Sequence, residues 1–138
     1  MPSTIRKVSY AYVEIPDKSG ELARVLDALR DGNVNLLGFS GFPQGRAKSQ
    51  LDLFTDDLNG LKTIAKQRKW KLSRIKRCFL VQATDEIGAA VPPLSAVANA
   101  GINLIASYAI AAGEGRFGML FWVEPRDYNR AAKLLGAS

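Results

Sequence analysis

The 138-residue chain contains no histidine and a single cysteine, Cys78. Without histidine it lacks the commonest general base, the commonest zinc ligand and every Ser–His or Cys–His nucleophilic pair. One cysteine excludes an internal disulfide framework and a metal site built from several thiolates. We therefore expect a protein without catalysis, without a metal and without a cofactor.

Long apolar runs are also missing. The N-terminal residues Met-Pro-Ser-Thr-Ile-Arg-Lys hold no apolar core of signal-peptide length, and no run approaches the length of a membrane span. A hydrophobic content of 47% and a mean hydropathy of −0.04 are typical of a globular domain. We expect a cytoplasmic protein with no membrane partner.

Acidic residues are absent from residues 62–77, although the chain carries a net charge of +6. This segment contains eight basic residues: Lys62, Lys66, Arg68, Lys69, Lys71, Arg74, Lys76 and Arg77. Such a run can bind anions or nucleic acid. It can equally be a solvated helix face followed by an edge strand that its charges protect from aggregation, and we favour this second interpretation.

What the chain does contain is a repeat. Asp17-Lys-Ser-Gly-Glu-Leu22 is followed by Asn33-Val-Asn-Leu36, and Asp85-Glu-Ile-Gly-Ala-Ala90 is followed by Gly101-Ile-Asn-Leu104. The corresponding Asp, Gly and Asn residues are each 68 positions apart. A fixed period indicates one supersecondary unit used twice. Units this small bury little surface alone, so we expect them to share a core.

Each copy predicts the same order of elements. In the first, strands are expected at 8–15, 34–42, 49–55 and 71–75, with amphipathic helices between the first two and the last two. In the second, the expected strands are 78–83, 102–111 and 117–123, again with two helices. Pro92-Pro93 must lie in the first turn of its helix, where missing amide donors cost least. The order βαββαβ predicts an α+β fold of two ferredoxin-like modules in tandem, with antiparallel sheets and helices on one face.

The second copy ends at Ser138 without a fourth strand of its own. Residues 3–7 precede the first strand of the chain just as residues 71–75 precede the first strand of the second copy. We infer a reciprocal exchange in which residues 3–7 complete the second sheet and residues 71–83 run as one long strand. The predicted modules are therefore 1–76 and 77–138.

Strand alternation also predicts an apolar surface. If Ala11, Val13, Ile15, Leu51, Leu53, Phe79, Val81, Met119 and Phe121 face the helices, the other sheet face carries Tyr10, Tyr12, Phe54, Leu80, Leu120 and Trp122. So apolar a face should be covered by the sister repeat or by a second chain. We favour a homodimer.

The two repeated loops form the candidate ligand site. Free amide groups at a helix N-terminus suit a carboxylate, and a glycine lets the backbone approach a ligand. Asp17 and Asp85 can accept a hydrogen bond from an ammonium group, and Asn35 and Asn103 offer both donors and acceptors. The candidate residues are Asp17, Ser19, Gly20, Glu21, Leu22, Asn35, Asp85, Ile87, Gly88, Ala89 and Asn103. The alternative is that the aspartates are helix caps and the asparagines shape turns; recurrence in both copies favours binding.

The Asp-x-x-Gly-x-Leu loop, the helix and the Asn-Val-Asn-Leu or Gly-Ile-Asn-Leu segment resemble the ACT domain, in two copies covering nearly the whole chain. The resemblance implies a regulatory module that pairs with others and binds an amino acid or similar ligand where modules meet. It implies that loops 17–22 and 85–90 contact the ligand, with Asn35 and Asn103 as the family's ligand asparagine. Ser19 and Ile87 stand where the family usually has proline, and Ala90 replaces its leucine. With no catalytic domain present, a stand-alone sensor or the partner of an enzyme is expected.

RNA binding and catalysis are the two alternative functions. An RNA-recognition motif shares the βαββαβ order, and Gly115-Arg-Phe-Gly-Met-Leu-Phe-Trp122 resembles its aromatic strand, but Met119 stands where an aromatic ring is expected. An enzyme would have to use Asp56/Asp57, Asp85/Glu86 or Cys78. Adjacent acids at a helix start do not converge on one atom, and no base lies near Cys78 in the sequence.

Overall fold

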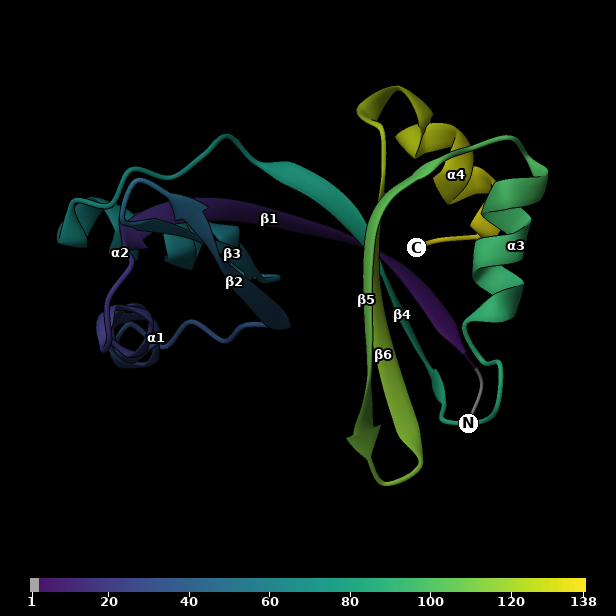
Figure 1. Ribbon diagram of the computed structural model, residues 1–138, viewed down its shortest axis with the longest axis horizontal. Coiled ribbons are helices and arrows are strands. Elements are labelled where there is room, and N and C mark those ends of the chain that lie inside the picture. Colours follow the sequence, from purple (N-terminus) through teal and green to yellow (C-terminus); the bar gives the residue numbers. More distant parts are fainter. Residues whose placement is uncertain (1–2) are drawn as a thin grey trace. The chain divides into compact units, whose positions relative to one another are not determined.

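The computed structural model describes residues 3–138 and has the predicted α+β class (Figure 1). The elements follow in the order β1 (Thr4–Pro16), α1 (Glu21–Asp31), β2 (Gly38–Gly45), β3 (Lys48–Phe54), α2 (Leu58–Arg68), β4 (Lys76–Thr84), α3 (Val91–Asn99), β5 (Leu104–Gly113), β6 (Arg116–Val123), the 3-10 helix η1 (Pro125–Asp127) and α4 (Tyr128–Leu135). The succession βαββα therefore occurs twice. None of the helices within residues 3–138 has the length and apolar character needed to span a lipid bilayer.

The chain divides into two compact units. One is Ser9–Lys76, and the other joins residues 3–8 to Arg77–Ser138. The long strand β1 therefore contributes its first residues to the unit that contains the C-terminus. The backbone amide of Lys7 donates to the carbonyl oxygen of Ser138 (2.9 Å). The backbone amide of Ser138 donates to the carbonyl oxygen of Ile5 (3.2 Å).

In the unit of residues 9–76 the strands lie in the order β2-β3-β1, all antiparallel. Both helices cover one face: Val25 and Leu29 of α1 and Leu61 and Ile64 of α2 are buried in one cluster with Leu51 and Leu53 of β3. The helix α1 has Gly32 as its C-cap, and Asn33 after it takes a left-handed conformation with φ of 59°.

The predicted strand at residues 71–75 is wrong, and so is the single long strand 71–83, because β4 begins only at Lys76. Residue 73 does lie beside β1: its amide donates to the carbonyl oxygen of Tyr12 (2.9 Å). The amide of Tyr12, however, donates to the hydroxyl of Ser73 (2.8 Å). A side-chain oxygen takes the place of a backbone acceptor, so the regular ladder does not form here.

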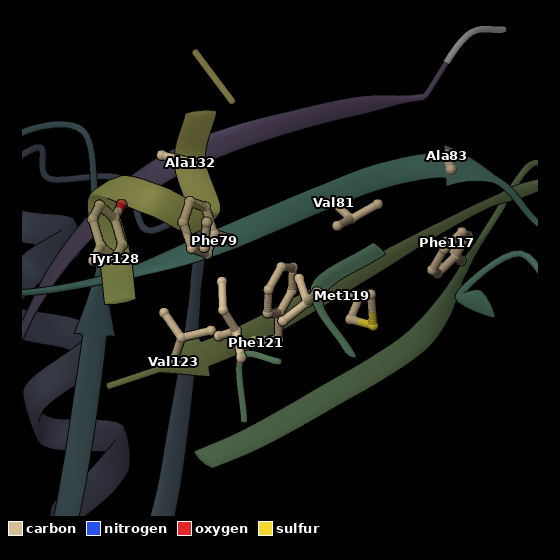
Figure 2. Close-up of a cluster of buried hydrophobic side chains, with 12 residues drawn as sticks. Phe79, Val81, Ala83, Phe117, Met119, Phe121, Val123, Tyr128 and Ala132 are labelled. Carbon is tan, nitrogen blue, oxygen red and sulfur yellow. The ribbon is translucent and has the colours of Figure 1, made fainter. Parts of the chain in front are cut away.

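In the other unit the strands lie in the order β5-β6-β4-β1, and α3 and α4 pack on one face. Figure 2 shows the core of this unit, where side chains from β4, β6 and α4 meet. The ring of Phe79 stacks on that of Tyr128 with centroids 4.5 Å apart and on that of Phe121 at 5.2 Å. Ile5 of β1 packs against the same cluster.

Nearly all the side chains predicted to face the helices are buried, and Ile15 is half-buried. The apolar side chains predicted on the other face are largely covered within the single chain. Tyr10, Phe54, Leu80 and Trp122 are each at most 9% exposed in the single chain. These four side chains are therefore covered without a second chain, and the homodimer stays a prediction.

Candidate functional site

The first candidate corner lies between β1 and α1. Gly20 occupies the N-cap position with φ of 89°, a left-handed conformation that favours glycine. No side chain caps the helix. Among residues 3–138, neither the amide of Ser19 nor that of Gly20 has a hydrogen-bond acceptor. The corner therefore presents unsatisfied donors at the positive end of α1.

Asp17 does not act as the helix cap that the alternative interpretation required. One of its carboxylate oxygens accepts from the hydroxyl of Ser49 (3.1 Å), and its amide donates to the carbonyl oxygen of Ala47 (2.8 Å). Asp17 is thus held against the turn between β2 and β3, with its side chain exposed. Ser49 and Ala47 were not predicted. The antiparallel pairing of Ile15 with Ser49 is the signal that leads to them.

The second corner, between β4 and α3, has a similar loop but a different helix start: Gly88 lies two residues before the N-cap Ala90, and Pro92 and Pro93 supply no amide to the first turn. Gly88 has φ of 73°, and no side chain caps α3. The amide of Asp85 donates to the carbonyl oxygen of Gly115 (2.8 Å), which lies 68 positions after Ala47. Within the described part of the chain, the amides of Glu86, Ile87 and Gly88 have no acceptor.

Both corners are open. A Cβ placed on Gly20 would meet nothing within 4 Å, and one on Gly88 would meet only Val91 Cγ2 at 3.8 Å. The glycines are therefore required by backbone conformation and not by lack of space. Ile87 is fully exposed and Leu22 is 37% exposed, whereas Glu21 and Ala89 are half-buried. Glu21 lies 3.8 Å from Arg24, a weak surface pair.

The asparagines do not join these corners. Asn35 follows the end of α1 and Asn103 follows the end of α3, and the eleven residues of α1 place its two ends roughly 16 Å apart. Asp17, Lys18 and Leu22 line a cavity of about 280 Å³ together with Phe42, Pro43 and Ser49 of the β2–β3 hairpin. Asn35 instead lines a different, open cavity of about 480 Å³ with Asn33 and Phe39.

No protein-family model matches the chain, and no curated protein sequence matches it. Solved structures do. Protein BT0572 from Bacteroides thetaiotaomicron superposes with a TM-score of 0.76 at 17% identity, covering 97% of this chain and 88% of its own. The ligand-free regulatory subunit of aspartate kinase from Thermus thermophilus gives 0.66 at 13% identity, with 99% and 95% covered. The regulatory subunit from Thermus flavus gives 0.57 at 18%, with 98% and 94% covered.

The chain has the tandem ACT-domain fold. At these identities the likeness establishes the architecture, and the ligand has to be argued from the residues themselves. The tandem ACT fold also locates the two corners: each occupies the loop after the first strand of its βαββα succession.

The basic segment of this ACT fold is exposed to solvent. Lys66, Arg68, Lys71 and Arg74 are all exposed, and none of the eight basic residues of 62–77 forms an ion pair within the described chain. Lys76 lies 5.6 Å from the ring centroid of Tyr12 and Arg77 lies 4.0 Å from that of Tyr128.

The aromatic side chains that suggested RNA binding are buried. Phe117 and Phe121 belong to the core beneath the helices, and Trp122 is 9% exposed. Stacking on bases requires exposed ring faces. Strand β6 therefore offers no aromatic platform for RNA.

Proposed function

We propose that this protein is a regulatory module that binds a small carboxylate-bearing metabolite at its glycine corners, with a free amino acid the ligand that fits best. One observation carries the proposal: the same uncapped helix, left-handed glycine and acceptor-free amides occur in both units. A structural turn needs only one of these features. Their joint recurrence, with the preceding aspartate held to the same turn position, is what a repeated binding loop requires.

The chemistry of each corner suits the two charges of an amino acid. In the first unit the free amides lie at the positive end of α1, which attracts a carboxylate, and in the second the free amides belong to the loop that precedes α3. Asp17 and Asp85 present exposed carboxylates next to these amides, where an ammonium group can be paired. Side chains at the rim, Leu22 in the first unit and Ile87 in the second, provide apolar contact.

We also propose that two chains associate through their outer strands. Both β2 and β5 lie at an edge of the strand order and expose apolar side chains: Phe39, Phe42, Ile105, Tyr108 and Ile110. Strand β5, Leu-Ile-Ala-Ser-Tyr-Ala-Ile-Ala-Ala-Gly, carries no charge, although charged residues are the usual protection of an edge. Asn103 directly precedes β5 and Asn35 lies three residues before β2, so pairing with a second copy places them near the interface.

Regulation requires that the ligand distinguish two states of the protein or of a complex. The Thermus neighbours are named as regulatory subunits of aspartate kinase, which supports a partner enzyme of amino-acid metabolism for this chain. In this proposal the module itself performs no catalysis and changes the affinity or activity of its partner.

A thermal-shift screen of the twenty amino acids tests the proposal. A ligand at a hundred times its dissociation constant stabilises the folded state by about 2.7 kcal/mol, which gives a clear shift of the melting temperature. Asp85→Ala should reduce that shift without unfolding the protein, because Asp85 is exposed. Asp31→Ala, at the exposed far end of α1, is the matched control and should leave the shift unchanged. A screen without any shift contradicts amino-acid binding.

A further inference from the structure

The unit that contains the C-terminus has a cavity that the corner residues alone do not explain. It measures about 570 Å³ and lies between α3, α4 and the sheet. Pro92, Pro93 and Ala96 of α3 line one side, and Leu134 and Leu135 of α4 line another. Its base is formed by side chains of β1 and β4, namely Ile5, Val81 and Ala83. Ligand pockets for small molecules fall in the range of about 300–1,000 Å³.

This cavity opens at the second corner. Glu86, Ile87, Gly88 and Ala89 are among its lining residues, whereas Asp85 is not. A molecule seated at the Gly88 amides is therefore next to an apolar space that leads beneath α3. We propose that the ligand of this corner is an apolar amine, meaning a hydrophobic amino acid or the corresponding amine, whose hydrocarbon group enters the cavity. The inference rests on the proposed function for the corner and adds the ligand class and the unit that binds it.

Comparison of the two copies explains why the cavity occurs here. Val25 and Leu29 of α1 are buried and fill the space above the first sheet, and Trp70 and Leu72 pack against the same cluster. At the offset of 68 residues, α3 has Pro93 and Val97 in place of Val25 and Leu29, and Thr4 stands in place of Leu72. Ala90 likewise stands in place of Leu22. Of these smaller side chains, Pro93 lines the cavity itself.

The lining selects the chemistry of the ligand. Ten of the lining residues have apolar side chains, which favours a hydrocarbon group: Ile5, Val81, Ala83, Ile87, Ala89, Pro92, Pro93, Ala96, Leu134 and Leu135. Glu86 is the one charged residue among those that line the cavity, and within residues 3–138 no cation lies at ion-pair distance from it. In a protein with a net charge of +6, this carboxylate offers a local site for a protonated amine.

Three probes with the same phenyl ring separate the contributions of the amine and the carboxylate to binding. Phenethylamine carries only the amine, phenylacetate carries only the carboxylate, and phenylalanine carries both. Titration calorimetry on the full chain should show that phenylalanine and phenethylamine bind and that phenylacetate binds more weakly than either. Glu86→Gln should weaken both amine-bearing probes, because an exposed carboxylate is lost without disturbing the core.

The cavity itself is tested by filling it. Ala96→Leu places a larger side chain into the space and should weaken the binding of phenethylamine about tenfold or more. Ala98→Leu, on the exposed side of the same helix, is the matched control and should leave the affinity unchanged. A circular dichroism melt confirms that both variants fold. Unchanged affinity in the Ala96→Leu variant, or binding of phenylacetate as tight as that of phenethylamine, overturns the inference.

The outcomes also separate this inference from the proposed function. If phenethylamine binds and is blocked by Ala96→Leu but phenylalanine does not bind, the cavity assignment stands and the carboxylate site at the Gly88 amides fails. If polar amino acids shift the melting temperature while none of the three ring-bearing probes binds, the proposed function stands and the cavity assignment fails.

Discussion

The hydroxyl of Tyr128 donates a hydrogen bond to the backbone carbonyl oxygen of Cys78 across 3.0 Å. This bond ties α4 to β4 inside the core of the C-terminal unit (Figure 2). The phenol ring stacks on Phe79, and the guanidinium of Arg77 lies 4.0 Å from its centroid on the solvent side. Burial raises the pKa of Tyr128 to about 12, an effect that the positive charge of Arg77 only partly offsets.

Replacement of Tyr128 by phenylalanine should destabilise the protein by about 1–2 kcal/mol at pH 8, because the buried Cys78 carbonyl loses its side-chain donor. The variant keeps the ring and its stacking, so the loss measures the hydroxyl. Urea unfolding followed by circular dichroism gives the difference in free energy. A difference near zero at pH 8 contradicts the role assigned to this hydrogen bond.

The pH dependence of that difference follows from the raised pKa of Tyr128. The unfolded chain ionises this tyrosine near its ordinary pKa of 10.0, whereas the folded chain keeps it neutral up to about 12. The advantage of the wild type over Tyr128→Phe is therefore complete below pH 10 and is lost progressively as pH rises through 12. The total change should amount to roughly 2–3 kcal/mol, more than the advantage at pH 8, so Tyr128→Phe becomes the more stable of the two proteins at the alkaline end. If the difference in unfolding free energy between the two proteins stays constant from pH 8 to pH 11.5, the pKa of Tyr128 is not raised.

Asp57 caps α2, and its loss should cost about 1 kcal/mol. One of its carboxylate oxygens accepts from the amide of Gly60 at 2.9 Å. Asp127 occupies the equivalent position before α4 but makes no cap bond, and its contact with Arg130 (3.6 Å) is a surface pair. Chemical denaturation of Asp57→Ala and Asp127→Ala should therefore give a clearly larger loss for Asp57→Ala. Equal losses would mean that the cap bond contributes nothing.

Gly32 permits close contact between the end of α1 and helix α2. A Cβ at this position would overlap Ile64 Cδ1 and lie 2.7 Å from Ile64 Cγ1. Gly32→Ala should destabilise the protein by about 1–3 kcal/mol through overpacking. The second copy has Ala100 at the equivalent position, so alanine is compatible with this backbone elsewhere in the chain. Combining Gly32→Ala with Ile64→Val, which removes the Cδ1 methyl group, should recover part of the loss; an additive double variant contradicts the steric explanation.

The fold could be predicted to the extent that it depends on local patterns. The i, i+3, i+4 spacing of Leu22, Val25, Leu26 and Leu29 predicted α1, and the fixed offset between copies predicted a duplicated module. The segment 71–75 could not be predicted correctly, because its loss of regular pairing arises from one side-chain contact between Ser73 and Tyr12. Strand β2 starts at Gly38, four residues later than the apolar residues from Val34 suggested, since Val34 packs in the helix-side core instead.

The candidate site was predictable in part. Gly20 and Gly88 were predicted as places where the backbone can approach a ligand, and both lie in open loops before uncapped helices; their left-handed conformation was not predicted. The grouping of Asn35 with Asp17 could not be tested from spacing alone, because it depends on the length of α1 that separates them. The cavity beside Gly88 was not predicted. Its signal was present in the substitution of Val25 and Leu29 by Pro93 and Val97, but its volume depends on how α3 and α4 pack.

The most direct test of ligand binding at the glycine corners is a titration of ¹⁵N-labelled protein with individual amino acids, followed by the amide resonances of the backbone. The account predicts that a binding amino acid shifts the signals of Gly20 or Gly88 and their neighbours first and most strongly, while Gly60, in the first turn of α2, does not move. A full titration in which no corner amide shifts, or in which the shifts concentrate elsewhere in the chain, would contradict it.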